Sequence, residues 1–306
     1  MSISILCDAS HFLILSKSAS GNNGNLNDHS PPVGLRDHLH PSVSVRPSSI
    51  KILSTNALPD IVHHTTQTIA SAFKNDPIFH YSLNRHSRTT RLGFRGVYYE
   101  TLIRAARLND GMLLGIVDTA GIGLSTAAVV LPPGMTMESW RTIVPAGLCR
   151  LIREVGLVSV LVSVVSYSEK SMQFFLFFEL INFFKRMILN MPKEIANVRA
   201  RALGGPQRVY FYLLALGTTE SARGKGQGTA MVKHIQAIAA QENLPIWLEA
   251  TTYQSRDFYL TLGFVNEGEI VVGRGKVDHA GNKEKGGEGV TMWGMSWTPS
   301  PEDMLF

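Results

Sequence analysis

The stretch VYFYLLALGTTESARGKGQG, residues 209–228, decides the fold of this chain. Its first part, Val209–Gly217, is an unbroken apolar run, which is typical of a strand buried on both faces of a sheet. The loop 218–228 that follows ends in closely spaced glycines. Residues 229–241 then predict an amphipathic helix, because their apolar side chains recur on one face. A buried strand, a glycine loop and an amphipathic helix in this order predict an α/β domain.

The chain downstream of this stretch continues the pattern. Residues 245–250, 265–273 and 290–297 predict strands, because each is a short run of strand-forming residues between turn signals. Residues 255–262 predict a short helix that Gly263 closes. The alternation of strands and helices places this half of the chain in the α/β class.

The chain upstream begins with predicted helices. Residues 56–73 show helical spacing of apolar residues, with Asn56 as the expected N-cap and Pro59 in the first turn. Asp76 and Pro77 start a second, shorter helix in the same way, and a longer helix follows it. Asp76 is therefore interpreted as a helix cap in preference to a chemical group.

The chain is expected to consist of a leader and one domain. Residues 1–42 are rich in small polar residues and predict a flexible leader. Residues 43–300 then form the domain, in which 112–117 and 122–131 predict two strands joined by a turn. Residues 138–200 predict helices and form an insertion before the glycine-loop strand.

Composition excludes several classes of protein. The chain has 306 residues, of which 44% are hydrophobic, and its formal charge is +5, which suits a small anionic ligand better than nucleic acid. Its two cysteines, Cys7 and Cys149, form no metal-ligand pattern and no disulfide framework, so we expect a cytoplasmic protein without a metal. The apolar stretch 172–191 carries three charged residues, which favours a covered helix over a membrane span.

The loop Arg223–Gly228 carries the chemical signal. Glycines let the backbone approach a ligand closely, and the start of a helix presents N–H groups that favour phosphate oxygens. Arg223 and Lys225 add positive charge at the rim. The pattern is R-x-x-G-x-G. It is not a Walker loop, because Gly226 stands where that loop requires Ser or Thr, and its spacing does not fit a dinucleotide fingerprint.

In this context the sequence resembles the GCN5-related N-acetyltransferase (GNAT) superfamily, in its fungal form. Arg223, Gly226 and Gly228 match the family's Q/R-x-x-G-x-G/A motif between a strand and a helix. The similarity extends to three further segments, RDFYLTLGF at 256–264, AFKNDP at 72–77 and VLPPG at 130–134.

The resemblance covers residues 43–297, except that 138–200 match little. It implies a mixed α/β fold with a central twisted sheet flanked by helices, and a helical insertion before the cofactor-binding strand. Three positions depart from the family pattern, one of them Glu220, which stands where a proline is common. Thr218 stands where Val is usual, and Ser255 stands where the family has an asparagine.

The same resemblance implies acetyl-CoA as co-substrate. Backbone N–H groups of the loop would hold the pyrophosphate, and the strand backbone would pair with the pantetheine arm. The cofactor-binding residues implied are Leu214, Leu216, Arg223, Gly224, Lys225, Gly226, Gln227, Gly228 and Thr229.

Direct attack of an amine on a thioester requires a neutral amine, a stabilised oxyanion and a proton for the departing thiolate. The resemblance makes Tyr259 the candidate acid, while a packed aromatic side chain is the alternative. The strand Val209–Gly217 lacks the carboxylate that many family members use as base. Glu249 or a water relay to solvent could take this role, and a structural hydrogen bond is the other interpretation of Glu249.

The expected acceptor is the amine of a small, apolar metabolite. Its selection is assigned to the early helices, to the insertion 138–200 with its Phe-rich part, and to the loop 274–289. Three alternatives stay open: a non-catalytic CoA-binding module, O-acetyl transfer, and a protein that docks on a membrane surface through residues 155–191. The sequence does not determine the oligomeric state.

Overall fold

A computed structural model describes residues 52–53, 60–84, 87–118, 121, 123–135, 140–148, 150–151, 153–154, 191–205 and 208–301. The predicted leader 1–42 and residues 155–190 of the predicted insertion lie outside the described residues.

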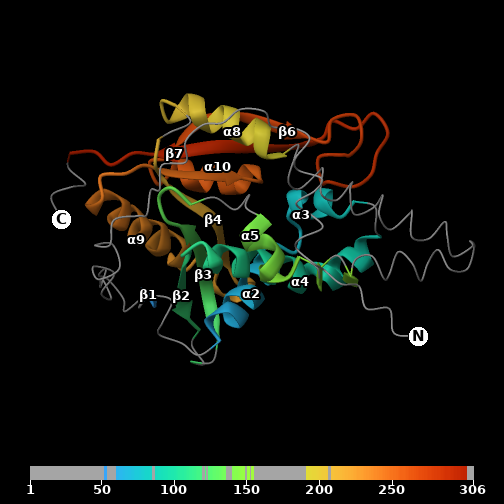
Figure 1. Ribbon diagram of the computed structural model, residues 1–306, viewed down its shortest axis with the longest axis horizontal. Coiled ribbons are helices and arrows are strands. Elements are labelled where there is room, and N and C mark those ends of the chain that lie inside the picture. Colours follow the sequence, from blue (N-terminus) through green and yellow to red (C-terminus); the bar gives the residue numbers. More distant parts are fainter. Residues whose placement is uncertain are drawn as a thin grey trace, which may run out of the picture. The chain divides into compact units, whose positions relative to one another are not determined.

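A mixed sheet forms the centre of the described part of the chain (Figure 1). Seven strands lie in the order β1-β2-β3-β4-β5-β7-β6, and every neighbouring pair is antiparallel except β4 and β5. This architecture confirms the predicted mixed α/β fold. The strands are β1 Ile52–Leu53, β2 Met112–Val117, β3 Leu124–Leu131, β4 Phe211–Thr218, β5 Ile246–Ala250, β6 Val265–Val272 and β7 Val290–Trp297.

Helices cover both faces of this sheet (Figure 1). Strand β3 shows the two layers, because its alternate residues enter different cores. Ala127 and Val129 pack with α2 and α4, whereas Ala128 and Val130 pack with α9. The helices are α2 Ile61–Ala72, α3 Pro77–Ser82, α4 Arg88–Leu108, α5 Trp140–Ile143, α8 Met191–Ala202, α9 Gln227–Gln241 and α10 Tyr253–Leu260, with a π-helical turn η2 at Val144–Leu148 and a 3₁₀ turn η4 at Glu220–Ala222.

Two helix starts differ from the predicted ones. Helix α2 begins at Ile61, after Asp60, and not near Asn56, which lies outside the described residues. Helix α10 begins at Tyr253, because the side chain of Thr252 accepts from the backbone N–H of Ser255 and forms a capping box with it. The predicted second helix is confirmed, with Asp76 as its N-cap.

The prediction that β4 is buried on both faces is wrong. Only Phe211, Leu213 and Gly217 are buried in it, whereas its other residues are partly exposed. Strand β3 is instead the one buried along its whole length. The apolar sequence of β4 is therefore not explained by burial on both faces. The pairing of β4 with β5, described below, bears on it.

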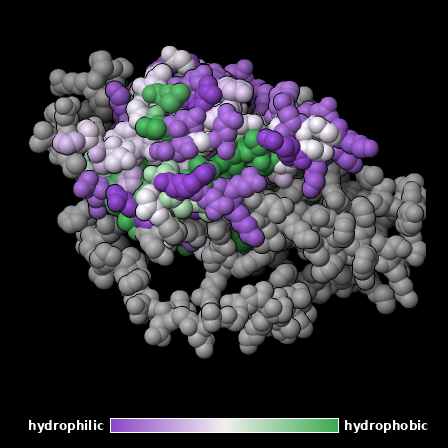
Figure 2. Space-filling model, turned by 90° about the horizontal axis from the view of Figure 1, so that it is seen from above, coloured by the Kyte–Doolittle hydropathy of each residue, from purple (hydrophilic) through white to green (hydrophobic). Residues whose placement is uncertain are grey.

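Helix α8 covers the sheet near β6 and β7. Its Val198 packs with Trp247, Ile270 and Met292. Seen from this side, the described surface is mainly hydrophilic, with smaller hydrophobic areas between (Figure 2). No helix among the described residues is long and apolar enough to span a membrane.

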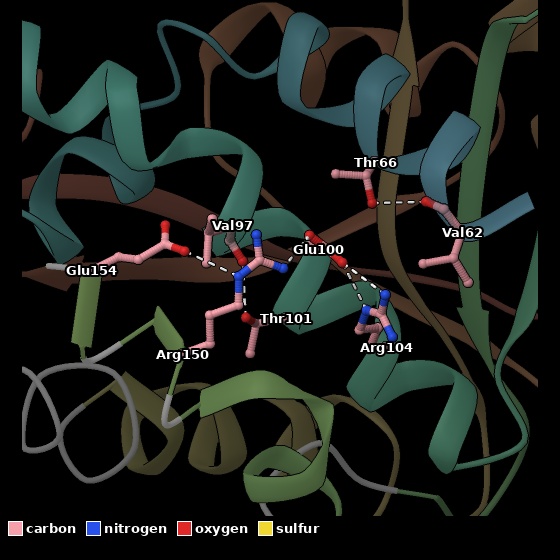
Figure 3. A network of polar contacts seen from close by, with 8 residues as sticks. All are labelled: Val62, Thr66, Val97, Glu100, Thr101, Arg104, Arg150 and Glu154. Atoms are coloured by element: carbon pink, nitrogen blue, oxygen red, sulfur yellow. Dashed lines mark hydrogen bonds and ion pairs between the residues drawn. The ribbon is translucent and has the colours of Figure 1, made fainter. Parts of the chain in front are cut away.

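Polar contacts join the start of the predicted insertion to α4 (Figure 3). The carboxylate of Glu100 accepts from Arg104, at 2.9 Å, and from Arg150, at 3.3 Å. Arg150 also donates to Glu154 at 3.0 Å. Both carboxylates raise the pKa of the Arg150 guanidinium. This network connects Arg150 and Glu154 to α4.

Candidate active site

Strands β4 and β5 separate soon after they meet. They pair only at Phe211 with Ile246 and at Tyr212 with Trp247. Beyond Tyr212, β4 continues to pair with β3 as far as Thr218. From Leu213 onward, no described strand therefore pairs with the β4 edge that faces β5. Its backbone groups are free to bind an extended ligand.

This separation explains the partial exposure of β4. Leu214 and Leu216 both lie on the stretch without a β5 partner, and both are partly exposed. They are the two residues that the sequence assigned to the pantetheine arm. The register between β3 and β4 shifts at Val129/Val130, which is a bulge beside the same stretch.

The glycine loop lies at the end of β4 and starts α9. Gly224 and Gly226 both have φ of 73°, a conformation that favours glycine, and both are exposed. A Cβ on either would meet nothing within 4 Å, so the space above the loop is open. Gly228 lies lower, and a Cβ there would come within 3.5 Å of the Phe258 ring.

This loop presents a row of free donors. The backbone N–H groups from Gly224 to Thr229 have no backbone acceptor among the described residues. The first N–H to find one is that of Ala230, which donates to the Gly226 carbonyl at 2.9 Å. The first turn of α9 carries no acidic residue. Free N–H groups and a helix N-terminus together suit phosphate oxygens.

Two cations lie at the rim of the loop. Arg223 and Lys225 are exposed, and the Arg223 guanidinium donates to the Ala72 carbonyl at 3.4 Å. Glu220 pairs with Lys74 at 3.1 Å, and Lys74 lowers the pKa of that carboxyl. The nine residues that the sequence assigned to the cofactor lie on β4, on the loop after it and on the first turn of α9.

The turn between α2 and α3 spans the separation of β4 and β5. At one end, Gly217 packs so closely on α2 that a Cβ there would lie 2.8 Å from the Ala72 methyl group. At the other end, the Thr251 hydroxyl, just beyond β5, donates to Asp76 at 2.5 Å. Asp76 also accepts from the Phe79 N–H at 2.9 Å, and its burial raises the pKa of the carboxyl. The sequence identified Asp76 as a cap but did not identify its partner Thr251.

Glu249 lies on β5 where the strands separate. Its carboxylate accepts from the Tyr212 hydroxyl at 2.6 Å and from the Trp247 indole N–H at 2.5 Å. Burial, followed by the charge of Glu249, raises the pKa of Tyr212 well above its usual range. These two hydrogen bonds support the interpretation of Glu249 as a structural residue.

Tyr259 lies on α10 and is buried. Its ring packs edge-on against Phe258 and Phe264, with centroid distances of 5.2 and 5.3 Å. Its hydroxyl makes no hydrogen bond to another described residue. Burial raises the pKa of this hydroxyl, so it keeps its proton at neutral pH, as an acid must.

The loop 273–289 packs on α3 and α4. Buried Arg91 of α4 donates to the His80 carbonyl at 3.0 Å and to the Asn282 side chain at 2.7 Å. This loop was expected to help select the acceptor, and it is thus held next to the helix that Asp76 starts. Within the described part of the chain, no group of three metal-ligating side chains could hold a metal ion.

A family model for the acetyltransferase (GNAT) family matches residues 195–264, the segment that contains β4, the glycine loop, α9, β5 and α10. Over these residues the chain is similar to the GNAT family. This similarity indicates an acyltransferase of the N-acetyltransferase type, with acetyl-CoA implied as the co-substrate.

The individual relatives of this chain are distant. An uncharacterized N-acetyltransferase of Schizosaccharomyces pombe is 26% identical over 208 residues, which are 68% of this chain and 72% of that protein. A histone acetyltransferase HPA2 and related acetyltransferase from Corynebacterium glutamicum has a similar structure, with 19% identity, a TM-score of 0.47, and coverage of 81% of this chain and 96% of its own. A putative arylalkylamine N-acetyltransferase 7 from the mosquito Aedes aegypti gives 13% identity, a TM-score of 0.48, and coverage of 82% and 89%.

Proposed function

We propose that this protein moves the acetyl group of acetyl-CoA directly to the amine of a small, apolar metabolite. One observation carries the proposal. The edge of β4 that lacks a strand partner is followed, after residues 219–223, by six residues whose backbone N–H groups have no backbone acceptor among the described residues. An extended polar arm that ends in a diphosphate matches this sequence of binding groups.

The residues of the loop and of β4 would hold the co-substrate. The N–H groups from Gly224 to Thr229 would bind the diphosphate, with Arg223 and Lys225 adding charge at its rim. The backbone at Leu214 and Leu216 would pair with the pantetheine arm. When bound, acetyl-CoA supplies the thioester carbonyl that an amine attacks.

The reaction requires two proton transfers, one to the departing sulfur and one away from the attacking amine. Tyr259 would donate its proton to the departing sulfur, since its hydroxyl is protonated at neutral pH and has no partner among the described residues. The proton of the amine would leave through Glu249 or through water. The two hydrogen bonds that Glu249 accepts stabilise its charged form, which weakens it as a base and favours the water route.

The surroundings of the turn between α2 and α3 support an apolar acceptor. Phe73 follows α2 directly, and its ring lies tilted against that of Tyr99, with a centroid distance of 5.7 Å. Phe79, Tyr98 and Tyr99 continue the aromatic cluster, with centroid distances between 5.0 and 5.7 Å. Of these rings Phe73 is partly exposed and the other three are buried beneath it, so an acceptor that approaches between this turn and the end of β5 would meet the Phe73 ring.

A second candidate is a CoA-binding module without catalysis. It is favoured by the same two hydrogen bonds on Glu249 and by the absence of acid and histidine from β4. Binding of acetyl-CoA without turnover for any amine would support this candidate.

Calorimetric titration with acetyl-CoA tests the proposal, together with a thiol-release assay on a panel of amines. The test variant is Gly226→Glu, which places a carboxylate where the diphosphate would lie. The matched control is Gly204→Glu, at another exposed glycine with positive φ, 79°, and nothing within 4 Å of its Cβ. We expect binding that only Gly226→Glu abolishes, and CoA release with some amine. A folded wild-type protein that does not bind acetyl-CoA would overturn the proposal.

A further inference from the structure

We propose that Thr126 is a positioning residue for the diphosphate loop and that it acts through Gln227. This inference rests on the proposed function, because it concerns how the loop is held ready for acetyl-CoA. Thr126 lies in the middle of β3 and is fully buried. Its hydroxyl donates to the side-chain oxygen of Gln227 at 2.9 Å, and it lies 3.1 Å from the Thr218 hydroxyl at the end of β4.

Gln227 connects Thr126 to the diphosphate loop. It is the first residue of α9 and directly follows Gly226, whose left-handed conformation starts the helix. Glycine has no side chain to cap the helix, and no side-chain cap bond is present there. The bond from Thr126 satisfies none of the free N–H groups of the first turn, but it ties the side chain of the first residue of α9 to the sheet.

The rest of the loop has little else to hold it. Residues 223–226 are exposed, and the two glycines among them allow the backbone to turn freely. The side-chain contact of Arg223 with Ala72 is long, at 3.4 Å. The direction of the free N–H groups thus depends on the Gln227 anchor and on the start of α9.

Other buried hydroxyls in this region use the backbone instead. Thr68 donates to the Leu124 carbonyl at 2.7 Å, and Ser125 donates to the Ile116 carbonyl at 3.1 Å. A buried hydroxyl needs a partner, and a nearby carbonyl is enough for that purpose. Thr126 differs, because its partners are side chains of β4 and α9, the two elements that the loop joins.

The test compares two acetyl donors in Thr126→Val and in the conservative variant Thr126→Ser. Acetyl-CoA contains the diphosphate, whereas acetylpantetheine lacks it. Valine has the shape of threonine without the donor, so we expect KM for acetyl-CoA to rise about tenfold, with kcat within about twofold of wild type. The kcat/KM for acetylpantetheine should not change, and Thr126→Ser should restore KM for acetyl-CoA.

Equal losses with both donors would show a general structural role of β3 and would overturn the inference, as would an unchanged KM for acetyl-CoA in a folded Thr126→Val protein. Gln227→Leu provides the second line of test, and it also serves if Thr126→Val fails to fold. It should raise KM for acetyl-CoA to a similar degree, and Thr126→Val should add less than about twofold to it, because both changes remove one interaction. Additive effects would contradict the route through Gln227. A wild-type protein without acetyl-CoA binding would instead refute the proposed function itself.

Discussion

The hydroxyl of Thr251 donates to the carboxylate of Asp76 at 2.5 Å, although the two residues are 175 positions apart. Asp76 caps α3 and ends the turn that follows α2, and Thr251 directly follows β5. The bond therefore fixes this turn over the place where β4 and β5 separate. It also leaves a carboxylate buried, with a raised pKa that burial causes.

Asp76→Asn should change how stability depends on pH. The native state raises the pKa of Asp76, so it binds the proton more tightly than the unfolded chain, and this group's contribution to stability falls as pH rises through that window. An amide avoids the burial cost and can still accept from the Phe79 N–H. We expect the variant to gain on wild type in free energy of unfolding as pH rises from 4 toward neutral. Urea titrations across this range provide the measurement, and parallel curves would contradict the expectation.

Two glycine substitutions in the loop should differ in effect. In Gly228→Ala the new methyl group reaches only ordinary contact, 3.5 Å from Phe258, so stability and acetyl-CoA binding should stay near wild type. In Gly226→Ala the φ of 73° disfavours alanine by about 1 kcal/mol, so α9 should start less well and binding should weaken. Denaturant unfolding and calorimetry measure both quantities. Equal effects of the two substitutions would show that the backbone of Gly226 is not what the ligand requires.

Tyr259→Phe should reduce turnover without reducing stability. The hydroxyl has no partner among the described residues, so its removal should leave the melting temperature within a few degrees of wild type. Loss of a general acid should lower kcat by about 10²-fold or more. The same variant should bind acetyl-CoA as wild type does. A normal kcat would assign Tyr259 to packing alone.

Glu249→Gln should affect stability more than chemistry. Glutamine replaces one of the two accepting oxygens with an NH2 group, so Tyr212 and Trp247 no longer each face an acceptor of their own, and a donor that loses its acceptor costs about 1–3 kcal/mol when buried. If the amine proton leaves through water, the pH profile of kcat/KM for the amine should keep its shape. A flattened basic-side profile, in a variant of nearly normal stability, would identify Glu249 as the base instead.

Whether the sequence predicts an interaction in this molecule depends on how far apart along the chain the two interacting residues lie. The loop and the start of α9 are local, so R-x-x-G-x-G and the helix after it were enough to predict them. The interactions of Thr126 with Gln227 and of Asp76 with Thr251 join residues 101 and 175 positions apart, and no local pattern indicates them.

The prediction that β4 is buried on both faces was wrong because it, too, depended on a contact between residues far apart in the sequence. Its apolar residues from Tyr212 to Leu216 have the composition of a strand covered on both sides. The sequence does not show that β5 turns away after Trp247, which leaves several of these residues partly exposed. An apolar strand next to a ligand and one inside a core have the same composition, so only the pairing of strands separates them.

The narrow parallel contact between β4 and β5 has a mechanical consequence. Two residue pairs are all that connect β1–β4 to β5, β7 and β6 through strand pairing among the described residues. A ligand arm that pairs with β4 in this gap would add a connection between the two parts of the sheet, β1–β4 and β5, β7 and β6. We therefore expect acetyl-CoA to slow amide hydrogen exchange in both β4 and β5, so that the substrate itself supplies part of the rigidity of the fold.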